Sequence, residues 1–215
     1  MHIDVYADIA CPWCYVGRAR LKEALAQRPD VDATLQWRPF QLQPDLPGDG
    51  GDFREVLERK FGSWDRAERM FDRIRQMGSE HGLTFNFDAI EAAPNTADTH
   101  RLILWAQAQD GHEGADRMAT ALFRAYFTDG RNVSDPTVLA DCAAEVGFDA
   151  AGARTLLGGD AYADAVHESQ QRAQRQGITG VPCYVFEDQR AVTGAQPVDA
   201  FLEVFDALQP ESSPQ

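Results

Sequence analysis

Two cysteines, Cys11 and Cys14, stand three positions apart in the run Cys-Pro-Trp-Cys. They follow an apolar, strand-like segment, residues 2–10, and precede a helical pattern, so we expect them on the first turn of a helix. Thiols with this spacing on one turn are close enough to form a disulfide. The unpaired N–H groups and the positive dipole end of a helix N-terminus favour the thiolate form of Cys11. The spacing and its context therefore predict a dithiol that exchanges disulfides with a substrate.

The two cysteines are expected to have different roles. Pro12, at the first helical position, gives up no N–H that the helix would use, and it leaves Cys11 facing solvent. Cys14 lies one turn further along and is expected to be more buried. Cys11 is then the thiol that attacks, and Cys14 resolves the mixed disulfide. The alternative is half of a zinc site, but zinc needs a second close pair of ligands, whereas Cys142 and Cys183 stand alone in the sequence.

Hydrophobic periodicity gives the order of the elements that position the dithiol. Residues 3–40 are expected to form a strand, a helix and a second strand parallel to the first. The chain then carries only helical patterns until about residue 176. Two short strands, 181–186 and 191–193, form an antiparallel hairpin before a last helix that Pro197 opens. Without the helical block this order is βαβ joined to ββα, which is the α/β arrangement of the thioredoxin fold.

This order predicts two parts and a tail. A discontinuous thioredoxin-like domain comprises residues 1–45 and 177–208, and a large all-helical insertion comprises residues 46–176. The chain end, residues 209–215, is rich in Pro and Ser and is predicted to be disordered.

Pro182, at the start of the hairpin, is the second chemical feature. Proline cannot donate to a strand ladder, so its place here needs a reason. A cis peptide bond between Val181 and Pro182 would turn the chain sharply and expose the backbone of Val181, which could pair with an extended peptide. The alternative is an ordinary trans proline at the start of an edge strand. We expect the cis form, with the Val181 backbone facing Cys11.

Five segments together resemble the FrnE-type, DsbA-like thiol–disulfide oxidoreductases. They are D-x-x-C-P-W-C-Y-x-G from Asp8, W-R-P-F-Q-L from Trp37, N-T-x-x-x-H-R-L from Asn95, G-I-x-G-V-P-x-x-V-F from Gly177 and V-x-G-A-Q-P from Val192. The resemblance extends over nearly the whole chain. It implies a thioredoxin fold with a helical insertion, a redox-active Cys11–Cys14 pair and a cis-proline, Pro182, opposite that pair.

A sister branch, the hydroxychromene-carboxylate isomerases and kappa-class glutathione transferases, is similar outside the dithiol. That branch typically has Ser in the place of Cys11 and binds glutathione beside it, so the two cysteines favour the oxidoreductase branch. By similarity to both branches, Asn95, Thr96 and His100 are candidates to line a pocket beside the dithiol. The alternative is that Asn95 and Thr96 cap a helix and that His100 is a solvated residue of its first turn.

Two positions depart from the family pattern. Pro12-Trp13 replaces the Pro-His of DsbA itself, which weakens the expectation of strong oxidising power and leaves Trp13 as a flat apolar surface for substrate. Cys183, directly after the proline, is expected near Cys11, as a third redox thiol, a metal ligand or, by preference, a small buried filler. Cys142 shares a helical face with apolar residues, and core packing is expected for it.

Composition narrows the partners and the location. The formal net charge of −14 disfavours nucleic acid and anionic membranes as partners. The sequence shows no signal peptide and no membrane span, which favours the cytoplasm. We expect a monomeric or homodimeric thiol–disulfide oxidoreductase that acts on protein or peptide disulfides or on a small thiol. It needs no metal or organic cofactor, and glutathione is a candidate co-substrate.

Two other functions stay open on the sequence alone. One is a glutathione-dependent isomerase or transferase that acts on a small aromatic substrate. The other is a non-enzymatic redox-sensing or metal-binding protein that uses Cys11, Cys14 and Cys183. The sequence does not decide whether the dithiol oxidises, reduces or isomerises its substrate, because the direction depends on the reduction potential.

Overall fold

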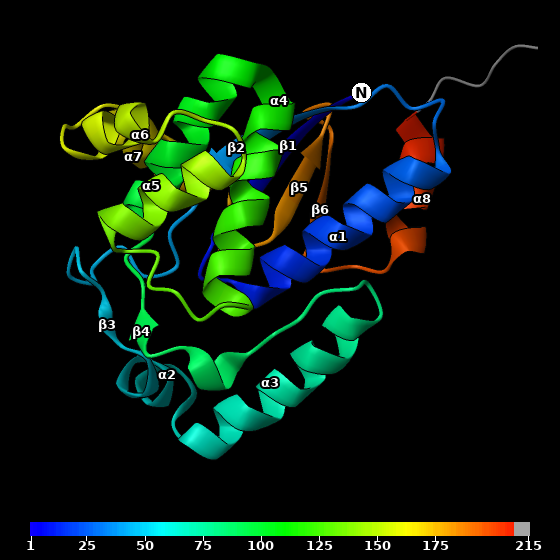
Figure 1. Ribbon diagram of the computed structural model, residues 1–215. Coiled ribbons are helices and arrows are strands. Elements are labelled where there is room, and N and C mark those ends of the chain that lie inside the picture. The colour runs from blue at the N-terminus through cyan, green and yellow to red at the C-terminus, as the bar shows by residue number, and fades with distance from the viewer. Residues whose placement is uncertain (209–215) are drawn as a thin grey trace, which may run out of the picture.

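The computed structural model describes residues 1–208, and the predicted tail, residues 209–215, lies outside the described part. A four-stranded sheet with the strand order β2-β1-β5-β6 forms its centre (Figure 1). The strands are β1 (His2–Ala7), β2 (Thr34–Pro39), β5 (Cys183–Phe186) and β6 (Arg190–Thr193). β1 pairs parallel with β2 and antiparallel with β5, and β5 and β6 form a hairpin. The predicted order of the thioredoxin fold is confirmed.

Eight helices surround this sheet in the described part of the chain. They are α1 (Pro12–Gln27), α2 (Phe53–Phe61), α3 (Trp64–Ser79), α4 (Ala97–Phe127), α5 (Pro136–Glu145), α6 (Ala150–Leu157), α7 (Ala163–Arg175) and α8 (Val198–Leu208). α1 and α8 pack together on one face of the sheet (Figure 1). α7 contributes Ala173 to a small cluster that contains Tyr6 of β1, on the other face. None of these helices is both long and apolar enough to cross a membrane.

The sequence predicted an all-helical segment between β2 and β5, and this prediction is wrong in one detail. β3 (Gly51–Asp52) pairs antiparallel with β4 (Ala92–Ala93). A strand of two residues is too short to show an alternating pattern, so the sequence carries no signal for it. Gly50 precedes β3 with φ +90°, and a Cβ there would lie 2.5 Å from the carbonyl oxygen of Ala93. Only glycine fits this close approach, which ties the start of α2 to the chain before α4.

Stacked aromatic rings join α1, α3 and α4. The ring of Tyr15 stacks on Phe123 with their centroids 4.9 Å apart, and Phe71 stacks on Phe87 at 4.0 Å. Phe87 in turn meets Phe127 edge to face at 6.0 Å. These contacts between rings hold α3 over the N-terminal half of α1.

Two buried arginines fix α1 against its neighbours. The Arg18 guanidinium donates to the Asp116 carbonyl oxygen at 3.0 Å and to the Thr120 hydroxyl at 2.6 Å, both on α4. Arg20 donates to the Ala195 carbonyl oxygen at 2.7 Å, beyond the end of β6. These charge-assisted hydrogen bonds hold the helix that carries the dithiol in one position between α4 and the hairpin.

Candidate active site

The dithiol lies at the first turn of α1, directly after the loop that leaves β1. Cys11 has extended backbone at the N-cap, Pro12 is the first helical residue, and the Cys14 N–H donates to the Cys11 carbonyl oxygen at 3.0 Å. Cys14 is 1% exposed, as predicted, but Cys11 is only 4% exposed. The prediction that Cys11 faces solvent is therefore wrong.

Cys11 is buried because helices from the segment between β2 and β5 cover it. Its side chain lines a cavity of about 250 Å³, which we call the thiol cavity. The dithiol turn and the chain before β5 contribute Cys11, Pro12, Trp13 and Val181 to its walls. α2 and α3 contribute Phe53, Leu57, Lys60, Phe61, Met70 and Phe71. The sequence of the dithiol turn alone could not predict this cover, since it comes from residues more than forty positions away.

The turn before β5 reaches the dithiol from the other side. The Val181–Pro182 peptide bond is cis. The Cys11 sulfur lies 3.6 Å from the Val181 carbonyl oxygen, so the backbone of Val181 faces Cys11. Pro182 packs toward α1, where a Cβ on Gly17 would lie 3.1 Å from the Pro182 Cγ. The missing side chain at Gly17 lets the turn and the helix approach each other.

A buried acid–imidazole pair, which the sequence interpretation did not include, lies next to the dithiol. Asp8 is 1% exposed, and its carboxylate accepts the N–H of Leu42 at 2.7 Å and that of Ala10 at 3.3 Å. His100 is fully buried, with Nε2 3.5 Å from the Asp8 carboxylate. The Trp37 indole donates to His100 Nδ1 at 3.3 Å. Because Nδ1 accepts this bond, the neutral ring carries its proton on Nε2, facing Asp8.

Asp8 and Cys11 both affect the pKa of the Cys14 thiol. Burial raises the pKa of the Cys14 thiol well above its usual range, and the hydrogen bond and charge of Cys11 act in the same direction. The Asp8 charge adds to this increase, and a hydrogen bond to the Asp8 backbone opposes it. The sequence did hold a signal for Asp8: this ionisable residue stands between an apolar strand and the dithiol, where a carboxylate that becomes buried often has a functional role.

Comparisons with known proteins decide the family. Residues 2–206 match the family model of the DSBA-like thioredoxin domain. The chain belongs to this family. It is similar to the crystal structure of the probable DsbA oxidoreductase SCO1869 from Streptomyces coelicolor, with 33% identity, a TM-score of 0.89, and coverage of 100% of this chain and 92% of that one. The resemblance to DsbA-like proteins that the motifs indicated is thus confirmed.

Two further solved structures share the fold. The cytosolic disulfide reductase DsbM from Pseudomonas aeruginosa, with GSH, is 25% identical with a TM-score of 0.64, over 97% of this chain and 100% of that one. A 2-hydroxychromene-2-carboxylate isomerase has a TM-score of 0.71 over 97% of this chain and 94% of that one, and its 17% identity shows the common fold alone.

In this DSBA-like domain, Asn95 and Thr96 position the start of α4 and do not line the thiol cavity. The Asn95 side chain accepts the N–H of Ala97 at 3.0 Å and donates to the Leu46 carbonyl oxygen at 2.7 Å. Thr96 is buried and makes no capping hydrogen bond with its side chain. The capping interpretation therefore holds for Asn95 only. The structure brings none of Asn95, Thr96 and His100 to the cavity, and the solvated alternative for His100 is wrong because Trp37 and Asp8 enclose its ring.

The two remaining cysteines, Cys142 and Cys183, are buried and pack among other side chains away from the thiol cavity. Cys183 faces Tyr6 across the sheet ladder and packs with Tyr6 and Phe40, on the other face from the cluster that holds Cys11. The expectation that Cys183 lies near Cys11 is therefore wrong. Cys142 is fully buried on α5, as expected, and burial raises the pKa of its thiol to about 11. Within residues 1–208, no group of three or more His, Cys, Asp or Glu side chains could hold a metal ion.

Proposed function

We propose that this protein is a thiol–disulfide oxidoreductase in which Cys11 attacks and Cys14 resolves. One observation carries the proposal: the Cys11 sulfur lies at the N-terminus of α1, 3.6 Å from the Val181 carbonyl oxygen, and lines the thiol cavity. A substrate sulfur in that cavity can reach Cys11 but not the more buried Cys14. Membership of the DSBA-like family supports the same chemistry.

The exchange balances within the dithiol and one substrate disulfide. The Cys11 thiolate attacks a substrate sulfur, the substrate S–S bond breaks, and one substrate half leaves as a thiolate. Cys14 then loses its proton and attacks the Cys11 sulfur, and the second half leaves. Two electrons pass from the dithiol to the substrate, and the reverse sequence oxidises a substrate dithiol. The raised pKa of Cys14 keeps that thiol protonated before the mixed disulfide forms.

The cellular setting belongs to the same proposal. We place the protein in the cytoplasm, with glutathione as a candidate co-substrate and no metal or organic cofactor. Support comes from the relative described as a cytosolic disulfide reductase, whose structure was determined with GSH. Disulfide-bearing peptides or small thiols are the proposed substrates, and the direction of exchange follows from the reduction potential.

The test is an equilibration of the protein in glutathione redox buffers, followed by alkylation and mass spectrometry. Cys11 should be the first thiol labelled at neutral pH, and the Cys11–Cys14 pair should oxidise as a unit. A reduction potential of about −270 mV, close to that of thioredoxin, indicates a reductase, and one of about −120 mV, close to that of DsbA, indicates an oxidant. Cys11→Ser should abolish the exchange, whereas Cys142→Ser is the matched control.

First labelling at Cys142 or Cys183, or exchange that persists in Cys11→Ser, would contradict the proposed roles. Conjugation of glutathione to an aromatic electrophile that continues in Cys11→Ser would support the transferase alternative instead.

A further inference from the structure

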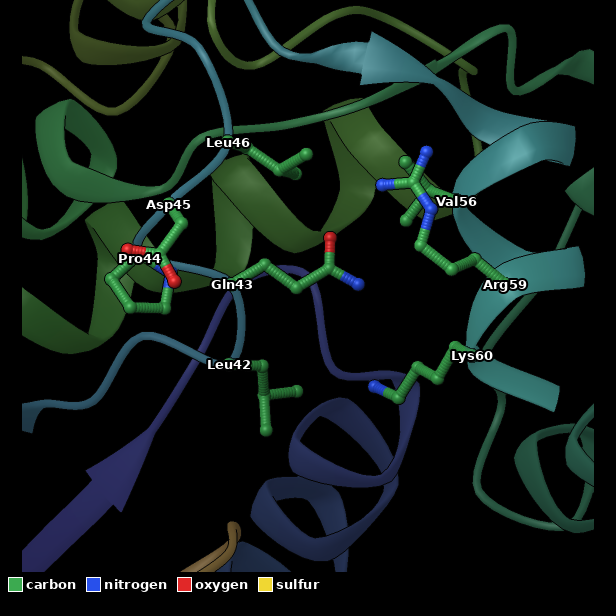
Figure 2. A pocket seen from close by; sticks show the side chains of 8 residues that line it. All are labelled: Leu42, Gln43, Pro44, Asp45, Leu46, Val56, Arg59 and Lys60. Carbon is green, nitrogen blue, oxygen red and sulfur yellow. The ribbon is translucent and has the colours of Figure 1, made fainter.

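Two cationic side chains gather beside the thiol cavity. Lys60, in the last turn of α2, lines the thiol cavity and also a second hollow of about 300 Å³. We call this second hollow the basic hollow; it is lined by Leu42, Gln43, Pro44, Asp45, Leu46, Val56, Arg59 and Lys60. Figure 2 shows the Arg59 and Lys60 side chains reaching into it, with the Gln43 amide between them. The two spaces adjoin, because Leu42 and Lys60 line both.

These two cations have no anionic partner among residues 1–208, where other arginines such as Arg54 and Arg75 form ion pairs. The Lys60 ammonium group lies over the Phe61 ring, 5.7 Å from its centroid. Asp45 also lines the basic hollow, but Figure 2 places its carboxylate beside Pro44, on the opposite side from Lys60. In a chain with a net charge of −14, two such cations beside the reactive thiol favour an anionic group there.

The thiol cavity sets the size and polarity of the rest of the ligand. Apart from Lys60, the side chains that α2 and α3 contribute to its walls are apolar, and its volume of about 250 Å³ accepts a single ring or branched chain. Cys11 is 4% exposed and lies at a cavity that α2 and α3 partly form, which favours a small disulfide over one on the surface of a folded protein. Because the basic hollow adjoins this cavity, one small molecule can occupy both spaces.

We propose that the substrate is a small disulfide, or the thiol formed from it, that carries an apolar group and a carboxylate. This inference rests on the proposed function and adds the substrate class. The apolar group lies in the thiol cavity against Cys11, and the carboxylate meets Arg59 and Lys60. Cys11 attacks the nearer sulfur, the far half leaves as a thiolate, and Cys14 then displaces the near half, so two electrons pass to the substrate.

The test measures single-turnover rates of the pre-reduced, full-length protein with three small disulfides. Dithiobis(nitrobenzoate) is aromatic and carries carboxylates, dithiodipyridine is aromatic and neutral, and glutathione disulfide is anionic without a ring. The double variant Arg59→Gln/Lys60→Gln should slow dithiobis(nitrobenzoate) by about fivefold, the size expected of two exposed charge contacts, and leave dithiodipyridine unchanged. The matched control, Arg69→Gln/Arg73→Gln, removes two exposed charges from α3 outside both spaces and should slow neither reagent.

A second variant tests the apolar half. Leu57→Asn should slow both aromatic reagents more than it slows glutathione disulfide, because only the aromatic reagents place a ring against Leu57, with thermal melting to show that the variant is folded. Salt at about 0.5 M should remove most of the difference between wild type and the Arg59/Lys60 variant, because the contacts are exposed.

Several outcomes would overturn the inference. They are equal slowing of the charged and neutral reagents by the Arg59/Lys60 variant, no slowing by it, equal slowing by the α3 control, and faster reduction of insulin than of dithiobis(nitrobenzoate) by the wild type. A fast reaction that persists in Cys11→Ser would instead remove the proposed function. The two failures are therefore distinguishable.

Discussion

The substitution Asp8→Asn tests whether the buried acid organises the turn that carries the dithiol. The Asp8 carboxylate accepts N–H groups from Leu42 at 2.7 Å and Ala10 at 3.3 Å, and it faces His100 Nε2 at 3.5 Å. An amide keeps one acceptor oxygen. If this oxygen stays with Leu42, the new NH₂ group points its hydrogens at the N–H groups of Ala10 and His100. The substitution therefore replaces two attractive interactions by two donor–donor approaches.

The magnitude follows from two changes: the Ala10 N–H loses its acceptor, and His100 Nε2, which has no hydrogen-bond partner among residues 1–208, meets a donor in place of a carboxylate oxygen. A buried donor left without an acceptor costs about 1–3 kcal/mol. The distances from the Asp8 carboxylate to Ala10 and His100 are long, so we expect Asp8→Asn to reduce the free energy of unfolding by about 2 kcal/mol. Asp8→Ala also removes the short hydrogen bond to Leu42 and should cost about 4 kcal/mol. Asp49→Asn, an exposed loop residue, is the control and should stay within about 0.5 kcal/mol of wild type.

Urea unfolding of the reduced proteins measures these differences, and a thiolate titration adds a readout that a purely structural role would not change. The Asp8 charge is one of the causes that raise the pKa of Cys14, after burial and Cys11. In a Cys11→Ser background, Asp8→Asn should therefore lower the Cys14 pKa, which stays above its usual value because burial remains. An Asp8→Asn protein with wild-type stability and an unchanged Cys14 titration would refute the reasoning.

Two further predictions concern packing and pH. Gly17→Ala should reduce the free energy of unfolding by about 1–3 kcal/mol, because the new Cβ would lie 2.6 Å from the Tyr184 hydroxyl. Thermal or urea unfolding measures this loss, and unchanged stability would show that α1 and β5 can separate freely. Burial raises the Cys142 pKa from 9.0 to about 11, so the unfolded state loses this proton first, and stability that is complete below pH 9.0 is lost as the pH rises to about 11. Two pKa units correspond to about 2.7 kcal/mol once the pH is well above 11, and Cys142→Ala should remove that part of the alkaline slope in pH-dependent urea unfolding; an unchanged slope would contradict this.

Local patterns were enough to predict the order of the elements and the place of the dithiol at the first turn of a helix. The dithiol, the helix after it and the hairpin that starts at Pro182 are each specified by residues within a few positions of one another. The cover over Cys11 is different, because it depends on how α2 and α3 pack across the N-terminus of α1. Phe53, Leu57 and Phe61 recur at helical spacing in the sequence, but this spacing does not show that part of the apolar face would line a cavity rather than the core.

Two errors about polar and thiol side chains have separate causes. The sequence predicted that His100 either lines a pocket or faces solvent. The neighbouring residues in the sequence do not show that Trp37 and Asp8 lie against its ring inside the core. For Cys183, the structure supplies the missing observation: Tyr184 packs in the cluster that contains Cys11, and neighbouring residues of a strand point to opposite faces. Cys183 must then lie on the other face, as it does, whatever its distance along the chain from Pro182.

In the function that we propose, different parts of the chain supply the reaction and the selection of substrate. The Cys11 sulfur and the Val181 carbonyl oxygen that faces it come from the N-cap of α1 and the turn before β5, both parts of the thioredoxin fold. The apolar wall and both cations come from α2 and α3, which lie between β2 and β5 in the sequence (Figure 1). We therefore expect substitutions at Leu57 or Arg59 to alter which disulfides reach Cys11 while the dithiol keeps its reduction potential. That independence is what a variant series on α2, measured both for rate and for potential, would reveal.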